Sequence, residues 1–294
     1  MKNKISEPGK GAFNVIAYAV LILLLVICTV PFIMIVSGSF SSNTAIMLNG
    51  YSLFPQDFSL DGYRAIFRYP EVIGRSYLVT IAITVIGTAL GLCVMTMAGY
   101  ALQRQDMRYR NQITFIIYFT TLFSGGMVPW YMVVTGLGLK NTIWAMILPT
   151  CASSFHILLI RNYVRGIPAS LVESAKIDGA GEFYIFLRII VPLSAPILAT
   201  VGLFLGLQYW NSWYTASLFV KESTLWPLQF RLYKMLTDQM ALLQGTTSAF
   251  KNMVIPTETL KLATAVVSTG PILLLYPFLQ KYFVRGITIG AVKG

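Results

Sequence analysis

The charged side chains that could act on another molecule gather in one short stretch of this chain, ESAKIDGAGEFYIFLRIIVPLSAP, which begins at Glu173. Three acids and two bases fall within sixteen residues there, whereas the sequence on both sides is apolar. A charged group costs several kcal/mol at the centre of a bilayer. The stretch must therefore lie outside a membrane, where its charges could form ion pairs with a partner protein.

The rest of the chain offers little that could make or break covalent bonds. A membrane hydrolase or glycosyl transferase needs a nucleophile beside a base or an acidic metal site, and neither occurs at a plausible depth. The sole histidine, His156, lies in an apolar run and is typical of a packing residue, and the three cysteines show no metal or disulfide spacing. The phosphate-loop pattern G-x-x-x-x-G-K-[ST] is absent too, so we expect no catalytic residue, no metal site and no nucleotide site in this chain.

A second stretch, QYWNSWY at 208–214, combines neutral hydrogen-bonding side chains with aromatic rings. A sugar ring could stack on such aromatic faces while the amides bond its hydroxyl groups. The candidates for a solute path are Gln208, Trp210, Asn211 and Trp213. The same composition is typical of an aromatic belt at the membrane surface with hydrogen bonds between helices, and the sequence favours this alternative.

Membrane helices must position these residues. Of the 294 residues, 56% are hydrophobic and only 11% are charged, against about 25% charged in an ordinary soluble domain. Six apolar runs are long enough to cross a hydrocarbon core, which takes about 20 helical residues. Because the runs are continuously apolar rather than alternating, we predict helices and one all-α membrane domain over residues 1–294. The runs lie near 15–40, 76–100, 113–134, 141–160, 193–219 and 260–284.

Basic residues indicate the orientation of this domain, because cytoplasmic loops are rich in Lys and Arg. Arg104, Arg108 and Arg110 crowd one tight turn, whereas the turn at 134–141 carries only Lys140. Both termini are therefore predicted to be cytoplasmic, and so is the loop at 165–192. The net charge of +11 fits this topology and anionic lipid headgroups better than it fits nucleic acid. The long segments at 41–75 and 220–259 then lie outside, the first as a folded cap.

The charged loop is predicted to form two short helices joined by a hinge. Pro168 suits a helix start, and the first helix would run to Asp178. Gly179 and Gly181 permit the left-handed backbone that a sharp turn requires. The second helix would bury an apolar stripe and end at Pro192. The residues of that stripe are Phe183, Phe186, Leu187 and Ile190.

At these residues the chain resembles the inner-membrane permease subunits of ATP-binding-cassette importers. Their cytoplasmic loop has the form E-A-A-x-x-D-G-A-x5-F-x2-I-x-L-P-x3-P, from which this chain departs by Ser174 for alanine and Val191 for leucine. The matching positions are Glu173, Ala175, Asp178, Gly179, Ala180, Phe186, Ile189, Pro192 and Pro196. The stretches SLFPQDFSLDGYRAIF, GLGLKNTIWAMILP and PFLQKYFVRGITIGAVKG resemble the carbohydrate-importing branch. Within it, FSGGMVPWY and WPLQF are similar to permeases for complex oligosaccharides, including plant cell-wall fragments.

The resemblance implies six transmembrane helices in the type I importer permease fold, with 168–178 as a cytoplasmic coupling helix in a bacterial inner membrane. The partners would be a second homologous permease, two ATP-binding-cassette ATPase subunits that hold ATP and Mg, and an extracellular or periplasmic solute-binding protein. The residues implied in ATPase coupling are Glu173, Ser174, Ala175, Asp178, Gly179 and Ala180. Glu173 would meet a basic group of the ATPase, and Gly179 would be the pivot. Trp226, Phe230 and Tyr233 would contact the binding protein.

Two alternatives remain at this point. Ser170 and Glu173 also form the pattern S-x-x-E of a capping box, in which the acid only satisfies a backbone N–H group. An ion-coupled secondary transporter would place acids or histidines within its spans, whereas no Asp or Glu falls inside the six runs. We therefore predict an ATP-driven carbohydrate importer permease that catalyses no bond chemistry itself.

Overall fold

The computed structural model describes residues 10–244 and 258–273 of the chain. All regular structure in those residues is helical apart from one isolated antiparallel bridge between Ser41 and Phe58, so the predicted all-α class is confirmed. The chain divides into two compact units. The N-terminal unit comprises Met1–Tyr69 and Met235–Thr269, and the central unit comprises Pro70–Lys234 and Gly270–Gly294.

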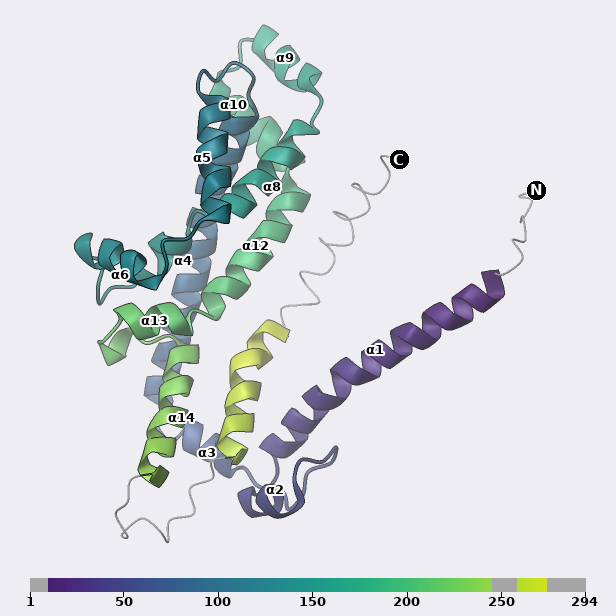
Figure 1. Ribbon diagram of the computed structural model, residues 1–294, viewed down its shortest axis with the longest axis vertical. Coiled ribbons are helices and arrows are strands. Elements are labelled where there is room, and N and C mark those ends of the chain that lie inside the picture. Colours follow the sequence, from purple (N-terminus) through teal and green to yellow (C-terminus); the bar gives the residue numbers. More distant parts are fainter. Residues whose placement is uncertain (1–9, 245–257, 274–294) are drawn as a thin grey trace. The chain divides into compact units, whose positions relative to one another are not determined.

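The N-terminal unit begins with one long apolar helix, α1 (Lys10–Ser39), drawn in purple in Figure 1. The first expected span, 15–40, lies in this helix. Its part Phe13–Ser39 is long and apolar enough to cross a membrane, and its apolar 18-residue window has no buried residue, whereas Ser37 and Ser39 at its end are buried. The side chains of that window must therefore face lipid or another protein.

A small cap follows α1 and packs on the start of the helix at residues 258–273, of which 258–269 belong to the same unit. It contains α2 (Asn43–Asn49) and α3 (Asp61–Ile66). The Oδ1 atom of Asn43 accepts a hydrogen bond of 3.0 Å from the backbone N–H of Glu258 and so caps that helix. The last expected span, 260–284, is described only as far as residue 273, and its remainder lies outside the described residues.

The axis of the central unit is α4 (Pro70–Gln103), which contains the second expected span, 76–100. It packs along α8 (Ser154–Arg165) and α12 (Ala195–Trp210). Glycines make this packing close: a Cβ atom at Gly87 would lie 2.6 Å from the ring of Tyr209, and one at Gly99 would lie 2.9 Å from Ile160. Small residues are the usual means by which membrane helices approach one another.

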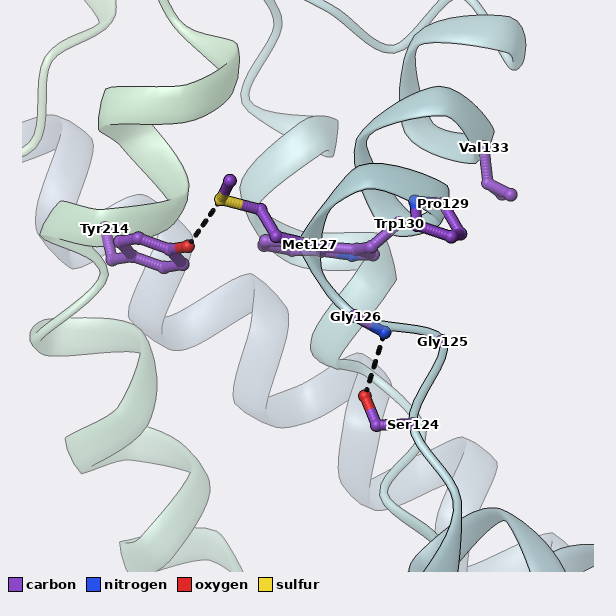
Figure 2. A pocket seen from close by; sticks show the side chains of 8 residues that line it. All are labelled: Ser124, Gly125, Gly126, Met127, Pro129, Trp130, Val133 and Tyr214. Atoms are coloured by element: carbon purple, nitrogen blue, oxygen red, sulfur yellow. Dashed lines mark hydrogen bonds between the residues drawn. The ribbon is translucent and has the colours of Figure 1, made fainter.

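The third expected span, 113–134, is not one helix but two, α5 (Arg110–Leu122) and α6 (Met127–Gly136). Gly126 adopts φ +81° between them, and its N–H donates to Ser124 Oγ at 3.2 Å (Figure 2). The prediction of a continuous helix is wrong because the pair of Gly125 and Gly126 separates two helices, instead of only bending a single helix.

The fourth and fifth expected spans are also interrupted. Among the described residues, two helices can cross a membrane unaided by length and composition, or four if each bent pair forms one span. The first bent pair joins Trp144–Thr150, which holds Pro149, to α8 at 48°. The second joins Glu182–Leu193 to α12 at 79°. The expected span 193–219 ends early, because α12 stops at Trp210 and a separate helix, α13 (Trp213–Phe219), follows.

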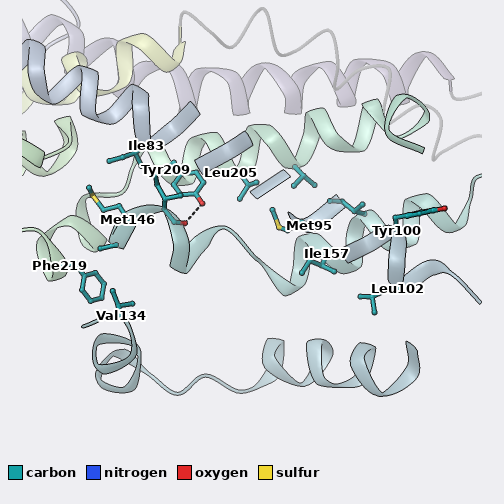
Figure 3. Packing of buried hydrophobic residues seen from close by; sticks show 14 of the residues in the cluster. Ile83, Met95, Tyr100, Leu102, Val134, Met146, Ile157, Leu205, Tyr209 and Phe219 are labelled. Atoms are coloured by element: carbon teal, nitrogen blue, oxygen red, sulfur yellow. Dashed lines mark hydrogen bonds between the residues drawn. The ribbon is translucent and has the colours of Figure 1, made fainter. Parts of the chain in front are cut away.

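The core of the central unit joins α4 and α12 to α7 (Trp144–Ile147). Tyr209 is 1% exposed, and its hydroxyl donates to the carbonyl of Ile147 at 3.0 Å (Figure 3). At one end of α4 the hydroxyl of Thr80 accepts a bond of 2.7 Å from the N–H of Leu228, at the start of α14 (Leu228–Gln244). At the other end Tyr100 packs on Phe186. The core thus holds Tyr209 of the QYWNSWY stretch against Gly87, near the middle of α4, and the charged loop at the C-terminal end of that helix.

Candidate functional site

The first helix of the charged loop is α9 (Ala169–Ile177), with Pro168 as its N-cap and Asp178 as its C-cap. These bounds match the predicted extent of 168–178. Most of its side chains are exposed, and Ile177 keeps 86% of its surface exposed. The helix therefore offers a free surface at the end of the central unit.

The hinge after α9 is a Schellman cap. The N–H of Gly179 donates to the carbonyl of Lys176 at 3.0 Å, and the N–H of Ala180 donates to that of Ala175 at 2.9 Å. Gly179 has φ +81°, as predicted, which would cost a residue with a Cβ atom about 1–2 kcal/mol. Gly181 has φ −70° and ψ 158°, so the prediction of a left-handed backbone there is wrong.

Glu173 is exposed, and its carboxylate has no hydrogen-bond or ion-pair partner among the described residues. The capping-box alternative is therefore wrong, because the N-cap is Pro168 and no side chain caps α9. Of the other coupling candidates, Ser174, Asp178 and Gly179 are also exposed. Ala175 and Ala180 are half-buried against the core.

A chain of charges connects the loop to the end of α4, and no pattern in the sequence predicts it. The guanidinium of Arg104 pairs with the carboxylates of both Asp106 and Glu182. Glu182 also pairs with Lys176 at 3.1 Å and accepts a bond of 3.1 Å from the hydroxyl of Tyr100. The bond from Arg104 holds the pKa of Asp106 at about 2, below its ordinary value of 3.8.

The second helical segment of the loop ends at Leu193, one residue beyond the predicted end at Pro192. It consists of α10 (Glu182–Ile185), a π-helical turn at Phe186–Ile190 and α11 (Val191–Leu193). The π turn changes which side chains share a face. Ile185, Phe186 and Ile190 are buried, whereas Phe183 and Leu187, two members of the predicted stripe, are exposed. That part of the prediction is wrong because it assumed an α-helical period.

Further along α4 towards its N-terminal end, the four solute-path candidates differ in how far they are buried. Gln208 is exposed at the end of α12, whereas Trp210 is only 6% exposed and belongs to the packing. Asn211 and Trp213 lie together beside the start of α14. There Asn211 Oδ1 accepts a bond of 3.3 Å from Gln229, and the ring of Trp213 lies 5.0 Å from that of Tyr233.

A pocket of about 560 Å³ opens between α6 and α13. The rings of Trp130 and Tyr214 lie within 18° of parallel with centroids 6.4 Å apart. Both rings line the pocket, and we call this pair the aromatic platform (Figure 2). The Tyr214 hydroxyl contacts the sulfur of Met127 at 3.0 Å. The other lining residues are Ser124, Gly125, Gly126, Pro129 and Val133.

The three candidates for contact with a binding protein differ in exposure. The side chain of Phe230 is 6% exposed, which conflicts with the prediction that it meets a partner. The half-buried ring of Trp226 lies edge-on to Phe230 at 5.1 Å, with the guanidinium of Arg231 4.6 Å from its centroid. Tyr233 is 46% exposed, so of the three it is the most accessible.

Comparisons with known proteins agree with this architecture. The family model of the binding-protein-dependent transport system inner membrane component matches residues 97–289. The chain is 39% identical to the polygalacturonan/rhamnogalacturonan transport system permease protein YtcP of Bacillus subtilis (strain 168), over 100% of both chains. It is 41% identical to Protein LplC of the same organism, over 91% of this chain and 90% of that one.

A solved structure shares the fold. It is the crystal structure of a bacterial ABC transporter involved in the import of the acidic polysaccharide alginate, of which one chain is 30% identical to this one. The match covers 95% of this chain and 99% of that chain with a TM-score of 0.80. The chain therefore belongs to the family of binding-protein-dependent transport system inner membrane components, and it is a permease subunit of the ABC transporter type.

Proposed function

We propose that this permease subunit imports oligosaccharides and takes the energy for import from ATPase subunits that dock on α9. The observation that carries the proposal is the free surface of α9, on which Glu173 has no partner among the described residues. A carboxylate held on a rigid, capped helix is suited to meet a cation of another protein. Glu173, Ser174, Asp178 and Gly179 form the docking surface, whereas Ala175 and Ala180 support it from behind.

The complete importer has a second permease, two ATPase subunits and an extracellular or periplasmic solute-binding protein. ATP and Mg bind to the ATPase subunits, and this chain performs no bond chemistry. Both of its termini and the loop at 165–192 lie in the cytoplasm. The other end of α4 then faces outward, so Tyr233 and the half-buried Trp226 are placed to meet the binding protein.

The solute class that the chain fits best is an oligosaccharide containing uronic acids. Two of its relatives are named for the import of such acidic chains, a polygalacturonan/rhamnogalacturonan permease and an alginate importer. At the outward end of the central unit, four cations have no carboxylate partner among the described residues, and they would attract an anionic solute. They are Arg75, Lys140, Lys221 and Arg231.

The aromatic platform supports the same solute class. Sugar rings have apolar C–H faces that pack on flat aromatic surfaces, and Trp130 with Tyr214 provides such a surface in an open pocket. Gln208, Asn211 and Trp213 are exposed nearby in sequence, whereas Trp210 is buried and takes no part.

The test is uptake into proteoliposomes that hold this chain with its companion permease, ATPase and binding protein. We expect short oligogalacturonides to be imported only with ATP, in preference to neutral arabino-oligosaccharides. Glu173→Ala should abolish uptake while the chain still inserts. Uptake that continues without the ATPase would favour an ion-coupled transporter instead, and equal uptake of neutral and acidic sugars would remove the uronate preference.

A further inference from the structure

Four alternating charges lie in one row at the cytoplasmic end of the central unit: Asp106, Arg104, Glu182 and Lys176. They come from three places, namely the turn after α4, the start of α10 and the last turn of α9. Two negative and two positive charges balance each other in this row. Of these four described residues, Glu182 is the one that forms ion pairs with both α9 and the segment after α4.

The contact with α4 is more than a loose surface pair. The side chain of Arg104 is only 18% exposed, although Glu182 is 51% exposed. The Tyr100 hydroxyl donates to the same Oε2 atom of Glu182 that Arg104 binds, at 3.1 Å, and the ring of Tyr100 is 8% exposed. Exposed ion pairs on their own contribute little, whereas charges in a network with a shielded, hydrogen-bonded member are held in place.

The position of Glu182 next to the hinge lets the charge network restrict movement of α9. Lys176 lies three residues before Gly179, and Glu182 lies three residues after it. The pair between them closes the hinge on itself, and the contacts of Glu182 with Arg104 and Tyr100 attach both sides of the hinge to α4. α9 therefore cannot swing about Gly179 without breaking charged contacts or moving the end of α4.

We infer that Glu182 is a positioning residue that transmits displacement of α9 to α4. The transmission continues from there into the bundle, because α8 and α12 pack along α4. The end of α4 is also tied to α8 by a bond of 3.1 Å from Arg161 Nε to the carbonyl of Leu102. This inference rests on the proposed function, in which an ATPase moves α9.

The test compares Glu182→Gln with Asp106→Asn in the reconstituted complex, using oligogalacturonides as solute. Each variant neutralises one of the two carboxylates that pair with Arg104. Asp106 forms no hydrogen bond or ion pair with the loop, and its carboxylate is influenced by Lys176 only through the charge of that residue. We expect Glu182→Gln to lower the amount of sugar imported per ATP hydrolysed by about fivefold or more, the lower range of typical coupling between sites. Asp106→Asn should leave this ratio close to that of the parent.

A double-mutant cycle with Arg104→Gln identifies the contact. Because Arg104 and Tyr100 both tie Glu182 to α4, the double variant Arg104→Gln with Glu182→Gln should lower the ratio by clearly less than the product of the two single losses. Additive losses, an equal loss with Asp106→Asn, or an unchanged ratio with Glu182→Gln would each overturn the inference. Co-purification of the ATPase with each variant separates lost coupling from lost assembly. If the parent complex itself imports no sugar with ATP, the proposed function fails instead.

Discussion

At the scale of single residues, the two hinge glycines have different backbone requirements. Gly179 has φ +81°, whereas Gly181 has φ −70°, and a Cβ atom at either would meet nothing within 4 Å. Only the backbone conformation therefore distinguishes them. Gly179→Ala should cost about 1–2 kcal/mol in the native hinge and open the bonds of the Schellman cap. We expect ATP-driven uptake to fall in Gly179→Ala and to stay at the parental level in Gly181→Ala, with both variants inserted in the membrane. Equal uptake by the two variants would contradict a role for the cap.

Tyr214 provides a second test at this scale, because its ring forms half of the aromatic platform. Tyr214→Leu removes the flat face but keeps the apolar bulk, and Tyr214→Phe removes only the hydroxyl that contacts Met127. Loss of one ring face should weaken the interaction with the sugar by roughly 1 kcal/mol, which corresponds to about a fivefold lower affinity. The binding protein delivers the sugar, so the measurement uses sugar-loaded binding protein at a saturating concentration. Under these conditions we expect the uptake rate to fall by about this factor. An unchanged rate for Tyr214→Leu would exclude the pocket from the solute path.

Residue types alone predicted the conformation of the hinge better than they predicted which aromatic side chains are buried. Asp178 and Gly179 were identified because capping depends on a few neighbouring residues. Phe230 and Trp210 were expected to face a partner or solute, but aromatic residues serve a core as well as a surface, and tertiary packing decides. From the sequence, Arg104 indicates only the orientation of the membrane domain. Its ion pair with Glu182 joins residues 78 positions apart, and no local sequence pattern predicts such a contact.

At the scale of elements, close packing of α4 can be tested with its own glycines. A Cβ atom at Gly87 would lie 2.6 Å from the ring of Tyr209, which is buried and hydrogen-bonded to Ile147. Gly87→Ala should therefore lower the stability by about 1–3 kcal/mol. Gly74 lies in the same helix with open space around it, so Gly74→Ala should be neutral or stabilise by up to about 1 kcal/mol. The apparent midpoint of thermal unfolding in detergent measures both, and equal midpoints would refute the close contact.

The helices themselves were predicted with uneven success, for a physical reason. Uniformly apolar sequence marks where lipid or a core can surround a helix, and α1 and α4 follow it closely. The break at Gly126 lies inside apolar sequence, so hydropathy could not locate it. The break beyond Trp210 falls at Asn211 and Ser212, polar residues that the prediction assigned to a solute path or an aromatic belt rather than to a helix end. The Gly-Gly pair did carry a signal, because two adjacent glycines permit a turn as well as a kink. Treating it as a turn would have placed Trp130 at the start of a separate helix, beside the pocket.

At the scale of the whole molecule, the proposed mechanism requires that α9 face the cytoplasm, where ATP is. The charged loop and the segment at 41–75 are then on opposite sides of the membrane. Each carries a strongly exposed apolar residue, Ile177 at 86% and Leu48 at 82%, which suits replacement by cysteine. In a chain without Cys28, Cys93 and Cys151, a membrane-impermeant thiol reagent should label Leu48→Cys in intact cells. Ile177→Cys should react only after the membrane is opened.

The matched exposure of these two sites makes the comparison decisive, because a difference in labelling then reports the side of the membrane and not burial. The reagent should also be blocked at Ile177→Cys by bound ATPase in opened membranes, since that residue ends the proposed docking helix. Labelling of Ile177→Cys from outside intact cells would reverse the topology. No cytoplasmic ATPase could then reach Glu173, and neither the docking surface nor transmission through Glu182 could operate.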